Sequence, residues 1–263
     1  QDDFRTAFKW LIGIALGASI ACITGVIDDI VDLKPIQKIS GQIVAAVILI
    51  LAGITPSLNF LHLFLGFTIP HDLEIIIGIP IVIFFVLGAT NSLNLLDGLD
   101  GLCAGVTAII TIAMFLLACH LSTWNTSRAG DPVRIIVCLG LIGGVLGFMP
   151  FNKYPAKIFM GDAGSLLIGY MLAVVSILTS YWKSGTDHPP YALAMPLVVL
   201  AVPLYDFTSV VVIRLFEGRN PLKGDQRHFS HRLVDRGLSR RSAVLTIYLA
   251  TATTGLAATL LPG

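Results

Sequence analysis

Long apolar stretches alternate with short polar segments along the whole chain. Eight of these stretches come close to the length of about 20 residues with which a helix crosses a bilayer. They are residues 8–27, 39–54, 75–92, 101–121, 133–149, 164–181, 191–213 and 242–261. Partial alternation of polar and apolar residues at 55–74 predicts a short β-hairpin on the outer surface. The pattern therefore predicts an all-α, polytopic membrane helical bundle of about eight transmembrane helices, forming one domain over residues 1–263.

Composition agrees with a membrane protein, and the distribution of charge predicts its orientation. Of the 263 residues, 55% are hydrophobic and 13% are charged. If the first span ends in the cytoplasm, the cytoplasmic segments are 28–38, 91–100, 150–163 and 214–241, which carry twelve of the seventeen Lys and Arg residues. Because cytoplasmic loops are enriched in Lys and Arg, this topology is favoured, with both termini outside. The net charge of +1 gives no indication of a nucleic-acid partner.

A polar stripe closes the third apolar stretch. Asn91, Asn94, Asp97 and Asp100 follow at intervals of three, and two Asp-Gly pairs then end the predicted helix. Carboxylates at a helix C-terminus face partial negative charge, so we expect a cation there. A divalent metal held by amide and carboxylate oxygens, with a phosphorylated ligand, would supply it. The alternative is an ordinary Asn/Asp/Gly-rich turn at the membrane surface.

Further carboxylates occur at two other predicted cytoplasmic boundaries. Asp28 and Asp29 end the first span, where the adjacent pair repels itself unless a cation or a shared proton intervenes. Asp162 lies between Gly161 and Gly164, where the sixth span begins. A solvated helix end is the alternative for the Asp pair, and an N-cap is the alternative for Asp162.

Two cytoplasmic loops carry groups that bind phosphorylated ligands. The loop at 150–163 contains Asn152, Lys153, Lys157 and Phe159, a mixture of amide, cations and aromatic ring that suits a nucleotide.

The basic loop at 214–241 contains His228 and His231 one helical turn apart, with Arg227 and Arg232 beside them. Such donors bind phosphate oxygens. Anchoring to anionic lipid is the alternative for this loop.

Asp206 is the acidic residue that falls deepest within a predicted span. An ionisable group inside a span costs roughly 2.5 to 3.5 kcal/mol if it meets lipid, so it must face protein or water. The sequence leaves open whether Asp206 is a packing partner or a site residue. It also leaves open a different class of protein, an ion-coupled membrane transporter, in which such acids line an ion path.

Four motifs, in order between the spans, resemble those of the polyprenyl-phosphate N-acetylhexosamine-1-phosphate transferases of the glycosyltransferase 4 type. They are Asp28-Asp29, Asn91-x-x-Asn94-x-x-Asp97-Gly-x-Asp100-Gly, Pro155-Ala-x-x-Phe-Met-Gly-Asp162-x-Gly-Ser and His228-x-x-His231-Arg-Leu. The last motif is closest to the branch that transfers GlcNAc-1-phosphate from UDP-GlcNAc to undecaprenyl phosphate. The muramoyl-pentapeptide branch, which serves peptidoglycan synthesis, is the alternative.

The resemblance implies an enzyme that transfers the sugar phosphate of a UDP-N-acetylhexosamine to a polyprenyl phosphate and releases UMP. This reaction is the first membrane step of cell-wall or surface-polysaccharide synthesis, including lipopolysaccharide. The expected place is the bacterial inner membrane, with the active site on the cytoplasmic face and Mg²⁺, or else Mn²⁺, as the cofactor. Membrane lipid is the expected surrounding partner, and a homodimer is left open.

The resemblance also implies roles for individual residues. Asp28 would accept the proton of the lipid phosphate, with Asp29 assisting. Asn94 and Asp162 would be metal ligands, with Asp97 in support, so that the catalytic acids are Asp28, Asp29, Asp97 and Asp162. The uridine would be held by Asp100, Asn152 and Phe159. The phosphates or the sugar would be held by Lys38, Arg227, His228, His231 and Arg232.

Two departures from the family pattern stand out. The two N-terminal helices that the family usually has, with their basic and Gly-rich cytoplasmic loop, have no counterpart, so we expect the chain to be N-terminally incomplete. Ser230 stands where the GlcNAc branch commonly has another histidine. We therefore expect no role in this motif that needs a third imidazole.

Overall fold

The structure, a computed structural model, describes residues 2–55, 70–123, 130–180, 195–218 and 228–260. All regular secondary structure in this part of the chain is helical, as the sequence predicts. In chain order the helices are α1 (Asp2–Val31), α2 (Pro35–Leu51), α4 (His71–Leu96), α5 (Leu102–Thr123), α6 (Gly130–Asn152), α7 (Gly161–Thr179), α8 (Met195–Val199), α9 (Ala201–Phe216), α10 (Phe229–Asp235) and α11 (Arg240–Leu260).

Six of the described helices are long and apolar enough to cross a membrane, which marks the chain as an integral membrane protein. They are α1, α4, α5, α6, α7 and α11. Helix α2 is apolar but shorter, with 17 residues. The predicted count of about eight spans is therefore not confirmed for the described part of the chain.

The span predicted at 191–213 corresponds to two helices, α8 and α9, which are separated at Leu200. Pro203 follows three residues later. Because proline has no backbone N–H, it cannot donate to the carbonyl of Val199, and a continuous helix breaks at this place. Most of the hairpin predicted at 55–74 lies outside the described residues, and its last four positions form the start of α4 instead.

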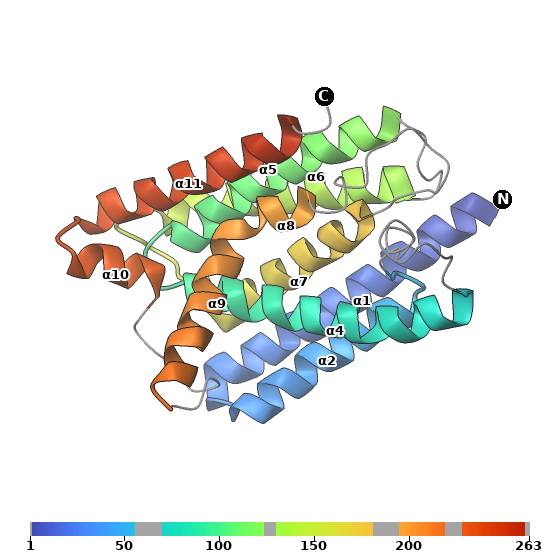
Figure 1. Cartoon of the computed structure of the whole chain (residues 1–263), viewed down its shortest axis with the longest axis horizontal. Coiled ribbons are helices and arrows are strands. Elements are labelled where there is room, and N and C mark those ends of the chain that lie inside the picture. The colour runs from blue at the N-terminus through green and yellow to red at the C-terminus, as the bar shows by residue number, and fades with distance from the viewer. Residues whose placement is uncertain (1, 56–69, 124–129, 181–194, 219–227, 261–263) are drawn as a thin grey trace.

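Helix α7 lies in the middle of the bundle, where it packs against α1, α4, α5 and α6 (Figure 1). Glycines allow the closest of these approaches. A Cβ atom built on Gly25 of α1 would lie 2.3 Å from the backbone oxygen of Asp162, and one built on Gly169 of α7 would lie 2.5 Å from the Cα of Thr90 in α4. Small residues let helix backbones approach closely in membranes. Gly25 and Gly169 therefore let α1 and α4 pack closely against α7, which also brings the polar residues of these helices near one another.

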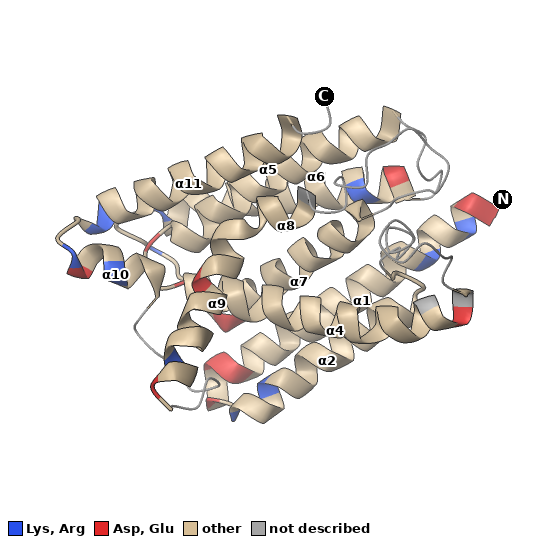
Figure 2. Cartoon of the chain, viewed as in Figure 1, with Lys and Arg blue, Asp and Glu red and all other residues tan. Residues whose placement is uncertain are grey.

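The charged residues of the described chain gather at the two ends of the long helices, and the middle of the bundle is apolar (Figure 2). The outward-facing middle carries large exposed apolar side chains, among them Leu16, Phe84, Leu116, Leu139 and Leu249. Such a belt suits contact with lipid. One charged end contains the last turn of α1, the start of α2, the end of α4 and the start of α7 (Figures 1 and 2).

Candidate active site

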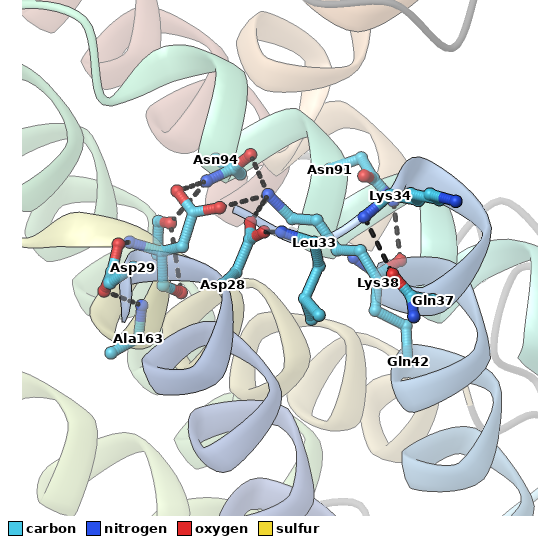
Figure 3. Close-up of polar contacts among 12 residues, drawn as sticks. Asp28, Asp29, Leu33, Lys34, Gln37, Lys38, Gln42, Asn91, Asn94 and Ala163 are labelled. Carbon is cyan, nitrogen blue, oxygen red and sulfur yellow. Dashed lines mark hydrogen bonds and ion pairs between the residues drawn. The ribbon is translucent and has the colours of Figure 1, made fainter. Parts of the chain in front are cut away.

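Four helices bring one polar side chain each to a common point at this end of the bundle (Figure 3). The Nζ atom of Lys38, from α2, lies 2.9 Å from Oδ2 of Asp28 in α1 and donates to Oδ1 of Asn94 in α4 at 3.0 Å. It also contacts Oδ2 of Asp162 in α7. The Asn94 amide donates to Oδ1 of Asp162 at 2.7 Å. Lys38 therefore lies between two carboxylates that the chain separates by more than a hundred residues.

Asp29 has a different partner from its neighbour Asp28. Its two carboxylate oxygens accept the backbone N–H groups of Asp162 and Ala163 at 2.9 and 3.1 Å (Figure 3). These N–H groups belong to the first turn of α7, where helices lack internal acceptors and favour a negative charge. The fit is close, because a Cβ atom on Gly161, whose φ is +65°, would lie 2.8 Å from the Asp29 carboxylate. Asp29 thus caps the helix that carries Asp162.

Asp28 also closes the turn between α1 and α2. Its Oδ1 atom accepts the backbone N–H of Leu33 at 2.7 Å, while Oδ2 faces Lys38. One carboxylate therefore fixes the backbone that leads into α2 and helps to place the lysine.

Asp97 follows the last residue of α4 and is partly buried beside this cluster. Burial, together with the negative charges of Asp162 and Asp29, raises the pKa of its carboxyl group to about 6. A hydrogen bond from the backbone N–H of Gly161 acts in the opposite direction. Burial is the larger cause, and the two neighbouring carboxylates add to it, so a cation bound beside Asp97 would favour its ionised form.

Asn94 also donates to Oγ of Ser165, at 2.9 Å. The sequence prediction gave Ser165 no role, although it ends the motif that contains Asp162 and lies one helical turn after Asp162 on α7. Further from the cluster, Asn91 donates to Oε1 of Gln42 at 2.8 Å. Asn91 lies about one turn before Asn94 on α4, and Gln42 lies about one turn after Lys38 on α2. Their bond therefore holds α2 and α4 in the register that lets Lys38 reach Asn94.

Asp100 and Asn152 connect the turn after α4 to the loop before α7. Oδ2 of Asp100 accepts the backbone N–H of Ala156 at 3.0 Å. Asn152 is buried, accepts the N–H of Gly101 at 3.2 Å and donates to the carbonyl of Ile158 at 3.0 Å. In this structure both side chains fasten loops together, and their predicted contact with uridine stays a prediction.

A pocket of about 620 Å³ opens next to this fastened turn. Gly98 and Asp100 line one side, Lys153 and Tyr154 another, and His231 a third. The guanidinium of Arg241 lies 4.8 Å from the centre of the Tyr154 ring. Phe159, predicted to stack on uracil, is not in the lining and is 75% exposed. The pocket thus offers cationic side chains, carboxylates and aromatic rings, and it lies next to Asp97 in the chain, since Gly98 lines it.

Helix α10 carries the histidine motif to the pocket. His231 lies beside the turn after α4, since its Nε2 would be 3.1 Å from a Cβ atom on Gly98. His228 is buried. Arg232 faces α9, where it donates to Oγ of Ser209 at 2.9 Å, and its predicted contact with phosphate stays a prediction. Arg227 lies outside the described residues.

Three comparisons with known proteins bear on this site. One relative, from Bacillus subtilis, is called a probable undecaprenyl-phosphate N-acetylglucosaminyl 1-phosphate transferase, and it is 34% identical over 245 residues, which cover 91% of this chain and 62% of the relative. A decaprenyl-phosphate N-acetylglucosaminephosphotransferase from Mycolicibacterium smegmatis is 34% identical over 246 residues, covering 90% of this chain and 59% of the relative. A phospho-N-acetylmuramoyl-pentapeptide-transferase from Enterococcus hirae is 32% identical over 223 residues, covering 80% and 64%.

The chain thus spans between 59% and 64% of the length of these curated relatives. The sequence model of glycosyl transferase family 4 matches residues 11–180, which is more than half of the chain. The matched part contains most of α1 and all of α2 and α4 to α7. It therefore includes Asp28, Lys38, Asn94 and Asp162, which together form the Lys38 cluster. The chain belongs to glycosyl transferase family 4.

Proposed function

We propose that this protein transfers an N-acetylhexosamine 1-phosphate, of which GlcNAc-1-phosphate is the first choice, from a UDP-sugar to a polyprenyl phosphate such as undecaprenyl phosphate. UMP is the second product. The site faces the cytoplasm in the inner membrane of a bacterium. The printed names of the Bacillus and Mycolicibacterium relatives support this choice of sugar and acceptor. Transfer of phospho-MurNAc-pentapeptide is the second candidate, supported by the Enterococcus relative.

The observation that carries the proposal is the meeting of Asp28, Asn94 and Asp162 around Lys38. Phosphoryl transfer between a lipid phosphate and a sugar nucleotide joins two polyanions, so the protein must chiefly position them and neutralise their charge. A transporter would instead need acidic groups along a path through the membrane. Here the charged residues of the described chain lie at the two ends of the long helices, and Asp28, Asp29, Asp97 and Asp162 come together at one of these ends.

The donor set at this point fits a magnesium ion. The oxygens of Asn94 and Asp162 converge on one position, because both contact the same Lys38 ammonium, and Asp97 adds negative charge beside them. Among the described residues no three His, Cys, Asp or Glu side chains form a ligand group. Mg²⁺ does not require one, since it is usually bound by one or two carboxylates together with phosphates and waters. When bound, the ion would supply positive charge for the diphosphate.

The chain's own residues then have distinct tasks. Asp28 accepts the proton of the polyprenyl phosphate, whose second pKa is near 6, so a weak base suffices. The lipid phosphate oxygen attacks the β-phosphorus of the UDP-sugar, and the bond to the α-phosphate oxygen breaks to release UMP. Lys38 would hold a phosphate oxygen, and His231 and Lys153 would supply further donors from the pocket wall. Asp29 keeps Asp162 in place through the α7 cap.

The test is release of UMP by the protein in detergent micelles, with polyprenyl phosphate, Mg²⁺ and either UDP-GlcNAc or UDP-MurNAc-pentapeptide. We expect turnover with UDP-GlcNAc, and a loss of at least about 100-fold in Asp162→Asn, because a transition-state charge contact is removed. Asp72→Asn is the matched control, since Asp72 is exposed at the opposite end of α4. Turnover with the pentapeptide alone would select the second candidate. Nucleotide-independent ion flux in liposomes, without UMP release, would reject both.

A further inference from the structure

Asp206 and His228 form a buried pair between α9 and the start of α10. Neither group is part of the Lys38 cluster. The Asp206 side chain has no exposed surface, and that of His228 is 7% exposed. Oδ2 of Asp206 lies 3.5 Å from Nδ1 of His228. Both atoms are buried and have no hydrogen-bond partner within the described part of the chain. Two unsatisfied polar atoms therefore face each other.

The second oxygen of the same carboxylate holds the backbone of α10. Oδ1 of Asp206 accepts the N–H of Phe229, the first residue of α10, at 2.5 Å. One carboxylate thus faces both the imidazole and the backbone at the start of this short helix. The Phe229 ring adds an edge-to-face contact with Tyr205, with 5.7 Å between ring centres.

The chemistry of a buried carboxylate explains why these groups face each other. An ionised carboxylate without a donor is costly in a dry interior, and so is an imidazole nitrogen without a partner. A histidine whose Nδ1–H points at a carboxylate has a fixed ring orientation and a fixed tautomer, and a carboxylate also stabilises the imidazolium form. In this geometry the Asp206 carboxylate is the group that can fix the orientation of the His228 ring.

We propose that Asp206 is a positioning residue, which holds His228 through Nδ1 and thereby seats α10 with His231 facing the pocket. The two histidines of the motif then differ in role. His228 is the buried link, with its ring centre 6.4 Å from that of His231. His231 lines the pocket beside Gly98 and is the imidazole that meets substrate. The part of this inference that concerns turnover rests on the proposed transfer reaction.

The pair can be tested without turnover. The protein is labelled with ¹⁵N-histidine in detergent micelles, and the His228 resonances are assigned with His228→Gln. In Asp206→Asn, the amide can still accept the Phe229 N–H, but its NH₂ group points at Nδ1. We expect the wild-type Nδ1 to carry a proton and the Asp206→Asn protein to show the other tautomer. Identical His228 spectra in the two proteins would overturn the proposal.

Ser209→Ala is the matched control, because it removes another hydrogen bond between α9 and α10, the one from Arg232, together with the bond from Ser209 Oγ to the backbone carbonyl of Asp206 within α9. It changes neither side chain of the pair. We expect its His228 spectrum to match the wild type. A change as large as that in Asp206→Asn would show that any loosening of α10 disturbs the ring, and the specific role of Asp206 would be rejected.

Turnover gives the second measurement. We expect Asp206→Asn to lower kcat about 10- to 100-fold, by analogy with the loss of a carboxylate that orients a metal-ligating histidine. In a double-mutant cycle, Asp206→Asn combined with His228→Gln should lose no more than either single variant. Independent, multiplying losses would contradict the pair. If the wild type itself releases no UMP, the proposed function fails, and the ¹⁵N spectra still decide whether the pair exists.

Discussion

The carboxylate of Asp29 accepts a hydrogen bond of 2.9 Å from the backbone N–H of Asp162, which lies 133 positions later in the chain. Helix α7 has no side-chain cap of its own, because its N-cap residue is Met160. A residue at the end of α1 therefore supplies the cap for the helix on which the candidate metal ligand Asp162 lies. The folding of the bundle and the assembly of the site depend on the same contact.

Asp29→Ala should lower the stability of the bundle and the turnover together. Loss of a helix cap typically costs about 0.5–2 kcal/mol, and Asp162 loses its fixed position. The measurement is the thermal midpoint in detergent, followed by UMP release at a temperature where the variant is folded. Asp29→Asn serves as the internal comparison, because its amide oxygen can still accept one of the two N–H groups. Equal midpoints for wild type and Asp29→Ala would show that the cap contributes nothing.

The close approach of α1 to α7 gives a second prediction. Gly25→Ala should destabilise the protein strongly, because the added methyl group would lie 2.3 Å from backbone atoms of Asp162, which cannot move as a flexible side chain does. Gly143→Ala is the control, since a Cβ atom there meets nothing within 4 Å. Alanine also favours helix over glycine by roughly 0.5–1 kcal/mol. We expect a lower midpoint for Gly25→Ala and no loss for Gly143→Ala; similar midpoints would contradict the packing argument.

The sequence was sufficient to predict the helical bundle and a meeting of distant acids at one face. Apolar length identifies spans, and the alternation of spans places Asp28, Asn94 and Asp162 on the same side. The structure brings these three residues together. The break between α8 and α9 was also encoded in the chain, by Pro203, but apolar length alone does not register it.

The partners within the site could not be predicted, because they depend on which helices touch. Lys38 was expected to hold phosphate, and the structure places it between Asp28, Asn94 and Asp162. Asn152 was assigned to uridine, and its amide is bonded to backbone groups on both sides. The same amide side chain can bind a ligand or hydrogen-bond to the backbone of a loop, and the local sequence does not distinguish the two. Only the tertiary contacts do.

Asp97→Asn should stabilise the unliganded protein while abolishing turnover. Burial and the neighbouring carboxylates raise the pKa of Asp97 from its ordinary value to about 6, so the folded state holds this proton more tightly than the unfolded state. The group therefore costs no stability below about pH 4, costs progressively more between pH 4 and 6, and imposes its full cost above pH 7, on the order of 1–3 kcal/mol.

An asparagine cannot ionise, so the difference in thermal midpoint between Asp97→Asn and wild type should grow from pH 4 to 6 and stay constant above 7. The midpoints are measured in metal-free buffer at each pH. A difference that is zero at pH 7.5, or that shrinks as the pH rises, would contradict the raised pKa of Asp97.

Lys38→Met should make the stability of the protein depend on magnesium. Without the ammonium, the carboxylates of Asp28 and Asp162 lose a shared counter-ion, which we expect to cost about 1–3 kcal/mol in metal-free buffer. A divalent ion held by Asn94 and Asp162 would replace part of the missing charge, so millimolar Mg²⁺ should raise the midpoint of this variant more than that of the wild type. Lys34→Met is the matched control, because Lys34 lies in the same turn between α1 and α2 but is exposed. Midpoints of Lys38→Met that are the same with and without Mg²⁺ would argue against a divalent cation at this point, and the charge for the diphosphate would then have to come from the protein's own lysine, arginine and histidine side chains.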